Sequence, residues 1–233
     1  MRIAIESTIH EMEGRLNGFI ALLFYRYANL CVKAQPLALL SAEIIDEELG
    51  ALNIEKVAAV VLPDDYHIRL IPFSPRYIFP LCKAIKLEHP EFKQDLVTPE
   101  NTDDEDLRHL ILTMPEVNKD RRDALIQSVD TLYDGCKAKM DKTCADYRLK
   151  LEKTIVILPT DDERNEAKDA LEAAIKNYQG LADTTKTEKV KEIEEAYQRY
   201  LDEQTSKRNQ ADETAAARGE HAGRQMRVGD SDE

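Results

Sequence analysis

Apolar residues recur at every third or fourth position over residues 3–33, which predicts one long amphipathic helix. The stripe consists of Ile9, Met12, Leu16, Phe19, Leu23, Tyr27 and Leu30. This spacing places all of these side chains on one helical face. Pro36 ends the pattern, because proline lacks the backbone donor of a helix and disfavours helix in the residue before it.

A second stripe with the same spacing begins after Asn118, a residue suited to cap a helix, and ends before Pro159. It consists of Leu125, Val129, Leu132, Cys136, Met140, Thr143, Tyr147 and Leu151. A third helical region runs over residues 167–181 and 190–201, with an interruption expected at Gly180–Lys186. Each stripe is too narrow for a solitary helix, so we predict a three-helix bundle with coiled-coil-like packing.

Between residues 37 and 116 short strand-like runs replace the helical stripe. Ala59–Leu62 and His67–Ile71 are apolar runs separated by the turn residues Pro63–Asp65. Ser74-Pro75 is typical of a helix start, because serine caps and proline fits the first helical position. Leu107–Leu112 returns as a strand. These signals predict a small α/β domain.

The predicted fold class is α+β, with a bundle formed by residues 1–35 and 117–205 and a small α/β domain inserted at residues 36–116. Two short linkers join the domains and are expected to act as a hinge. The hinge residues are Gln35, Pro36, Met114 and Pro115. Residues 206–233 lack an apolar stripe, and we predict that they form a disordered acidic tail.

The net charge of -13 is unfavourable for a nucleic-acid partner, but the charge is unevenly distributed. Residues 118–153 carry nine basic and seven acidic side chains, a basic excess within an acidic chain. Two interpretations of these basic residues stay open: contact with RNA phosphates, or pairing with acidic neighbours one helical turn away. No apolar run is long enough to cross a bilayer, so no membrane partner is expected.

The chemistry-bearing residues form no catalytic or metal-binding pattern. The four cysteines contain no Cys-x-x-Cys pair and the five histidines show no ligand spacing, so we predict reduced thiols, no metal and no cofactor. Asp64-Asp65 and Asp103–Asp106 are interpreted as a turn and a solvated loop, since no set of metal ligands accompanies them. Because nucleophile elbows and phosphate loops are also missing, we do not expect an enzyme.

An ordered series of segments resembles the ribosome recycling factors. Val32–Leu40 is similar to the family's Gly-Arg-Ala-Ser-Pro-x-x-Leu-Leu segment, which ends its first helix. Val57–Val60 resembles its Leu-Ala-Ser-Val strand, and His67–Phe73 its Leu-x-Ile-x-x-Phe-Asp strand. Cys82–Ile85 is similar to its Glu-Lys-Ala-Ile helix. Met114–Arg122 resembles Pro-Pro-Leu-Thr-Glu-Glu-Arg-Arg with one extra residue, and the resemblance covers roughly residues 5–205.

The resemblance implies an L-shaped molecule whose bundle lies across the rRNA of the large ribosomal subunit. It also implies a small domain that moves under an elongation-factor-G-type translocase. Basic positions of the family fall on Lys33, Arg121, Arg122 and Lys137. The family's later arginine cluster falls instead on Asp141, Cys144 and Ala145. Basic residues close by in the sequence that could substitute for this cluster are Lys139, Lys142 and Arg148.

Three functional hypotheses follow from these observations. The first is a translation factor that binds the large subunit and helps to split post-termination ribosomes. The second is a ribosome-associated assembly or structural factor that kept the fold but lost recycling, and the third is a coiled-coil adaptor unrelated to ribosomes. The acidic balance and the lost arginines favour the mitochondrial matrix as the location, with the cytoplasm as the alternative.

Overall fold

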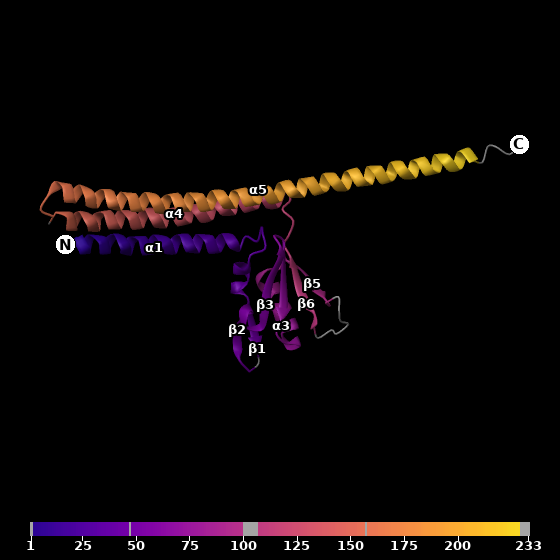
Figure 1. Ribbon diagram of the computed structural model, residues 1–233, viewed down its shortest axis with the longest axis horizontal. Coiled ribbons are helices and arrows are strands. Elements are labelled where there is room, and N and C mark those ends of the chain that lie inside the picture. The colour runs from indigo at the N-terminus through magenta and orange to yellow at the C-terminus, as the bar shows by residue number, and fades with distance from the viewer. Residues whose placement is uncertain (1, 47, 100–106, 157, 229–233) are drawn as a thin grey trace.

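The computed structural model describes residues 2–46, 48–99, 107–156 and 158–228. Three long helices lie side by side, and a small domain built around a sheet projects from one end of them, which gives the chain the shape of an L (Figure 1). The predicted fold class is confirmed. None of the described helices combines the length and the apolar character needed to span a membrane.

The bundle consists of α1 (Arg2–Ala28), α4 (Lys119–Ile155) and α5 (Asp161–Val228), each packed against the other two. The predicted cap of α4 is confirmed, since the side chain of Asn118 accepts a hydrogen bond of 2.9 Å from the backbone N–H of Arg121. The apolar stripes form one continuous core. Its fully buried members include Met12, Leu16, Val129, Met140 and Ile193.

The interruption expected at Gly180–Lys186 is wrong, because α5 continues through it. The hydroxyl groups of Thr184 and Thr185 donate to backbone carbonyls one turn earlier, at 2.9 and 2.8 Å, which lets these residues stay in the helix. Ala182 is buried in the bundle core. Packing of α5 against its neighbours therefore overrides the low helix propensity of glycine and threonine.

The small domain contains an antiparallel four-stranded sheet with the strand order β3-β4-β6-β5 and a separate β1-β2 hairpin. The prediction had missed β1, β2 and β5. The strands are β1 (Glu43–Asp46), β2 (Gly50–Asn53), β3 (Ala58–Asp64), β4 (His67–Pro72), β5 (Lys93–Val97) and β6 (His109–Thr113). The helices are η1 (Pro36–Ser41), α2 (Ile54–Val57), η2 (Pro75–Tyr77) and α3 (Ile78–Glu88).

The small domain has a hydrophobic core of its own, formed where α3 meets one face of the sheet. Leu81 and Ile85 of α3 pack with Ile68, Leu110 and Leu112 of the strands, and all five are 0–1% exposed. The predicted turn at Asp64-Asp65 is confirmed, because Asp64 accepts a hydrogen bond of 2.7 Å from the backbone N–H of Tyr66. Asp103–Asp106, predicted as a loop, lies outside the described residues.

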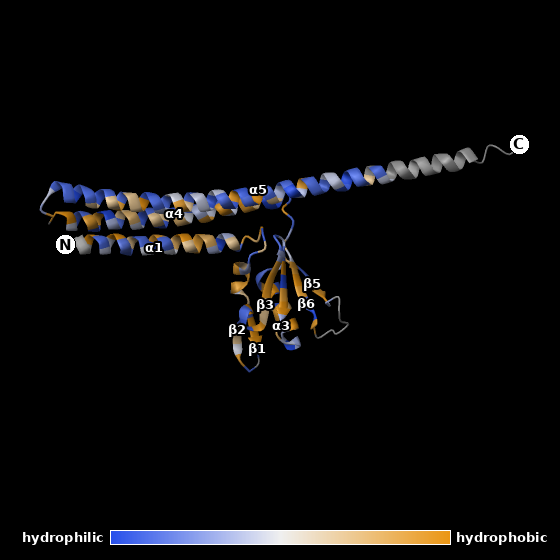
Figure 2. Cartoon of the chain, in the orientation of Figure 1, coloured by the Kyte–Doolittle hydropathy of each residue, from blue (hydrophilic) through white to orange (hydrophobic). Residues whose placement is uncertain are grey.

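The predicted disordered tail is a second correction, since α5 extends to Val228. Beyond the small domain this helix runs on alone (Figure 1), and the residues that Figure 2 colours there are mostly hydrophilic. Residues 206–211 are exposed. The segment is rich in alanine, glutamate, glutamine and arginine, which are strong helix formers, and it extends a helix already nucleated in the bundle.

Truncation after Thr205 is expected to leave the melting temperature of the bundle unchanged while lowering the helical circular-dichroism signal. The reason is that residues 206–211 pack against nothing in the described parts of the chain. Thermal denaturation of the two chains measures both quantities. A clear drop in melting temperature would instead show that the end of α5 docks on the body.

Candidate functional site

The two domains meet at an elbow, which we define as the linkers 29–35 and 114–118 together with the β3–β4 turn that touches them. Ala34 of the first linker donates a backbone hydrogen bond of 2.7 Å to Asp65 in this turn. Met114 of the second linker donates one of 2.9 Å to Tyr66. Of the predicted hinge residues, Met114 is buried in the core of the small domain and Pro36 begins η1. Both linkers are thus tied to the same turn.

Side chains of α5 also reach this turn. The ammonium group of Lys33 lies 3.8 Å from a carboxylate oxygen of Asp65 and 3.6 Å from one of Glu195 in α5. The guanidinium carbon of Arg199 lies 2.9 Å from the ring centroid of Tyr66, a close cation–π contact. Lys33, predicted to contact RNA, therefore bridges the two domains in this structure.

Arg121 and Arg122, onto which the family's basic pair falls, are both half-buried and contact other parts of the chain. Arg122 forms a forked pair with Glu194 of α5, through Nε at 2.9 and 3.0 Å and Nη2 at 2.5 Å. Its guanidinium also lies 5.3 Å from the ring centroid of Tyr197. The hydrogen bond to Glu194 raises the pKa of Arg122. Arg122 therefore fastens α4 to α5.

Arg121 points into the elbow rather than into solvent. Its Nη2 donates to the carbonyl oxygen of Cys31 at 3.4 Å, and its Nε is buried without a hydrogen-bond partner among the described residues. Burial is the main cause of the lowered pKa of Arg121. The cation remains charged, because the arginine guanidinium is not deprotonated in proteins.

Replacing Arg122 with glutamate is expected to lower the melting temperature by a few degrees, because two carboxylates then face each other between α4 and α5. The swapped variant Arg122→Glu with Glu194→Arg should recover most of the loss. Thermal denaturation at low and high salt measures both effects. Equal melting temperatures for the single and the swapped variants would mean that the pair contributes nothing to the bundle.

The other predicted basic residues of α4, from Lys137 onward, are exposed and lie on two different flanks of the helix. On the α5 side, Arg148 forms a two-pronged ion pair with Glu172, at 2.6 and 2.7 Å, and this pairing raises the pKa of Arg148. Lys137 lies on the same flank, 5.9 Å from the ring centroid of Tyr133. The charge of Arg148 is thus matched within the protein, but its partner lies on α5 and is not an acidic neighbour one helical turn away on α4.

On the α1 side, Lys139 and Arg26 line one groove between α4 and α1. Lys142 follows Lys139 by three residues, which places it on the same flank of α4. Among the described residues, none of these three cations forms an ion pair. Sequence reasoning missed Arg26 because only the antiparallel packing of α1 on α4 brings it beside Lys139. We call Arg26, Lys139 and Lys142 the basic flank.

The model of the ribosome recycling factor family matches residues 31–193, which include all of α4, the small domain and most of the elbow. The chain belongs to the ribosome recycling factor family. Two solved structures share the fold of this family member. One is a solution structure of a ribosome recycling factor, with 14% identity, a TM-score of 0.62, and coverage of 82% of this chain and 97% of that chain.

The second is from models of the T. thermophilus ribosome recycling factor and E. coli elongation factor G bound to the E. coli post-termination complex. It is 17% identical, has a TM-score of 0.55, and covers 81% of this chain and 98% of that chain. At these identities the likeness shows the fold alone. No curated protein matches this recycling-factor chain in sequence. Arg26 lies outside the segment matched by the family model.

Proposed function

We propose that this protein acts in ribosome recycling: it binds the ribosome with its helical bundle and helps to separate the subunits after termination. The observation that carries the proposal is the family match over residues 31–193, which spans both domains and the elbow between them. The action is one of shape and charge, without covalent chemistry. In this proposal the bundle is the arm that docks, and the small domain is the part on which a partner acts.

The basic flank is the surface we assign to large-subunit rRNA. Arg26, Lys139 and Lys142 are exposed, and no described acidic group pairs with them, so their charges are available for phosphates. Arg122 and Arg148 are engaged with Glu194 and Glu172, so docking through them would first require breaking a forked ion pair. This difference in pairing favours the α1 side of α4 over its α5 side as the rRNA-binding surface.

The small domain offers a surface of different chemistry, suited to a protein partner. Ile45, Phe79 and Leu87 are 68%, 80% and 73% exposed, and they line a shared hollow between β1 and α3. Exposed apolar side chains that gather in this way mark protein contacts more often than RNA contacts. We assign this face to a translocase of the elongation-factor-G type, the partner present in the post-termination complex described above.

Co-sedimentation with isolated ribosomal subunits over a salt series tests the docking step. We expect binding to the large subunit that falls steeply as salt rises, because released counterions accompany each phosphate contact. Binding to neither subunit at low salt would contradict the proposal and would favour the adaptor hypothesis. The mitochondrial matrix stays the proposed location, to be tested by fractionation of cells.

The assembly or structural factor stays a second candidate, favoured by the contacts at the elbow. Lys33 and Arg199 connect α5 to the β3–β4 turn, which restrains the swivelling that recycling is expected to need. Spin labels at Glu55 and Lys168, one in each domain, distinguish the two candidates. A broad distance distribution that changes on the ribosome supports recycling, whereas one narrow unchanged peak supports the static factor.

A further inference from the structure

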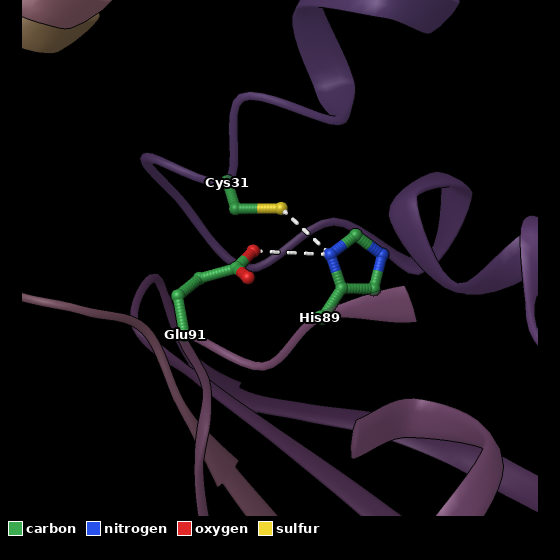
Figure 3. Close-up of side chains that lie close together, drawn as sticks. All are labelled: Cys31, His89 and Glu91. Carbon is green, nitrogen blue, oxygen red and sulfur yellow. Dashed lines mark hydrogen bonds and ion pairs between the residues drawn. The ribbon is translucent and has the colours of Figure 1, made fainter. Parts of the chain in front are cut away.

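Three potential metal ligands from two separate parts of the chain converge at the elbow. Cys31 lies in the first linker, whereas His89 and Glu91 lie in the turn between α3 and β5. Their ligand atoms all lie within 4.8 Å of one another. Both the thiol of Cys31 and the carboxylate of Glu91 point to the same ring nitrogen of His89, its Nδ1 (Figure 3).

The ring of His89 is held in one orientation. Its Nε2 lies 2.8 Å from the carbonyl oxygen of Ala38, and a carbonyl only accepts hydrogen bonds, so Nε2 carries the hydrogen. The ring also stacks on Phe92, with centroids 4.6 Å apart. In the neutral imidazole, Nδ1 therefore directs its lone pair at a carboxylate oxygen 3.1 Å away. Two acceptors at this separation need either a proton or a metal ion between them.

The distances fit a tetrahedral zinc ion. Zinc at about 2.3 Å from sulfur and about 2.0 Å from nitrogen separates these two ligand atoms by about 3.5 Å. Here the sulfur of Cys31 and Nδ1 of His89 are 3.6 Å apart. A thiolate, an imidazole and a carboxylate together favour zinc over magnesium or calcium, which prefer oxygen ligands alone. The hydrogen bond from Nε2 to a carbonyl is the usual support of a histidine ligand.

We propose that Cys31, His89 and Glu91 form a binding site for Zn²⁺ that joins the first linker to the small domain, with a water molecule as the fourth ligand. The side chain of Glu91 is 32% exposed, which leaves a route for the ion and the water. Cys31 adopts a left-handed backbone conformation with φ of 51°, uncommon for a residue other than glycine. Its side chain packs in the core of the small domain.

The charges around the site set its affinity. Burial, assisted by the carboxylate of Glu91, raises the pKa of the Cys31 thiol to about 12, so zinc must displace a proton to bind. Arg121 and Lys189 lie near and act in the opposite direction on this thiol. The thiolate and the carboxylate of Glu91 together offset the two charges of the ion. A zinc ion here would stiffen the elbow beside Arg121, which already holds the carbonyl of Cys31.

Titration of the full-length, metal-free chain with Co²⁺ and Zn²⁺ tests this site. We expect one ion per chain, with the near-ultraviolet charge-transfer absorption that a cobalt–thiolate bond produces and that Zn²⁺ abolishes by displacement. Cys31→Ser should remove this absorption, and Glu91→Gln should weaken binding by about 10-fold or more. Cys82→Ser is the matched control, because Cys82 lies outside the cluster, and it should behave as the unmodified chain.

Glu91 is exposed, so Glu91→Gln is expected to fold even if Cys31→Ser does not, and circular dichroism checks both. The proposal is overturned if the unmodified chain gives no thiolate absorption with Co²⁺. It is overturned equally if Cys31→Ser or Glu91→Gln, correctly folded, binds Zn²⁺ as tightly as Cys82→Ser. Neither result bears on ribosome binding, so the two proposals stand or fall separately.

Discussion

Replacing Lys139 and Lys142 together with glutamate is expected to weaken binding to the large ribosomal subunit by about 10- to 100-fold at physiological salt. Both side chains are exposed on the basic flank. The loss of two phosphate contacts should reduce the magnitude of the slope of log binding constant against log salt concentration by about two. Binding isotherms at several salt concentrations measure the affinity and its slope together. The fold should be unaffected, because neither lysine packs in the core.

The matched control for this variant is Lys168→Glu with Lys176→Glu on α5. It changes the net charge of the protein by the same amount at two exposed positions away from the basic flank. An equal loss of affinity in both variants would show that only the total charge matters. Unchanged binding in the Lys139 and Lys142 variant would show that the ribosome contacts another face of the bundle.

Replacing Leu112 with alanine is expected to destabilise the small domain by about 2–5 kcal/mol, the usual cost of a cavity at a fully buried leucine. Leu112 is 0% exposed and belongs to the core between α3 and the sheet, which is separate from the core of the bundle. The bundle should therefore keep its helical signal after the sheet unfolds. Urea denaturation followed by circular dichroism and by hydrogen exchange of the strands measures the two transitions.

Leu62→Ala is the control for this cavity, because Leu62 in β3 is 45% exposed and its truncation should cost far less. Simultaneous loss of the helical signal and the strand protection in Leu112→Ala would contradict the account of two separate cores. If Leu112→Ala lost its helical signal and its strand protection at the same urea midpoints as the unmodified chain, the surrounding side chains would have closed the cavity.

The three helices could be predicted because their apolar residues follow the helical period over several turns, as Met12, Leu16 and Leu23 do in α1. β5 could not, because it is a polar edge strand with lysine, glutamine and aspartate in sequence. The β1-β2 hairpin is only four residues a side. The end of α5 was missed for another reason, since intrinsic propensity rather than an apolar stripe keeps it helical.

The candidate sites depend on pairs that are distant in sequence, and this limited their prediction. Arg122 meets Glu194 across 72 positions, and Cys31 meets His89 across 58. Pairs so far apart in the sequence produce no local sequence pattern. The cap formed by Asn118 was predictable because it lies three residues from the backbone N–H that it accepts from. Family resemblance located the basic residues of α4, but only the packing of α1 separates the paired Arg148 from the basic flank.

If the proposal is right, this chain takes part in separating the subunits of post-termination ribosomes. The most direct test mixes such ribosomes with the full chain, a translocase of the elongation-factor-G type and GTP, and follows dissociation by light scattering. We expect the ribosomes to split into subunits only when the chain and the translocase are both present, and more slowly with the Lys139 and Lys142 variant. Ribosomes that bind the chain but stay intact with the translocase and GTP would contradict the proposal.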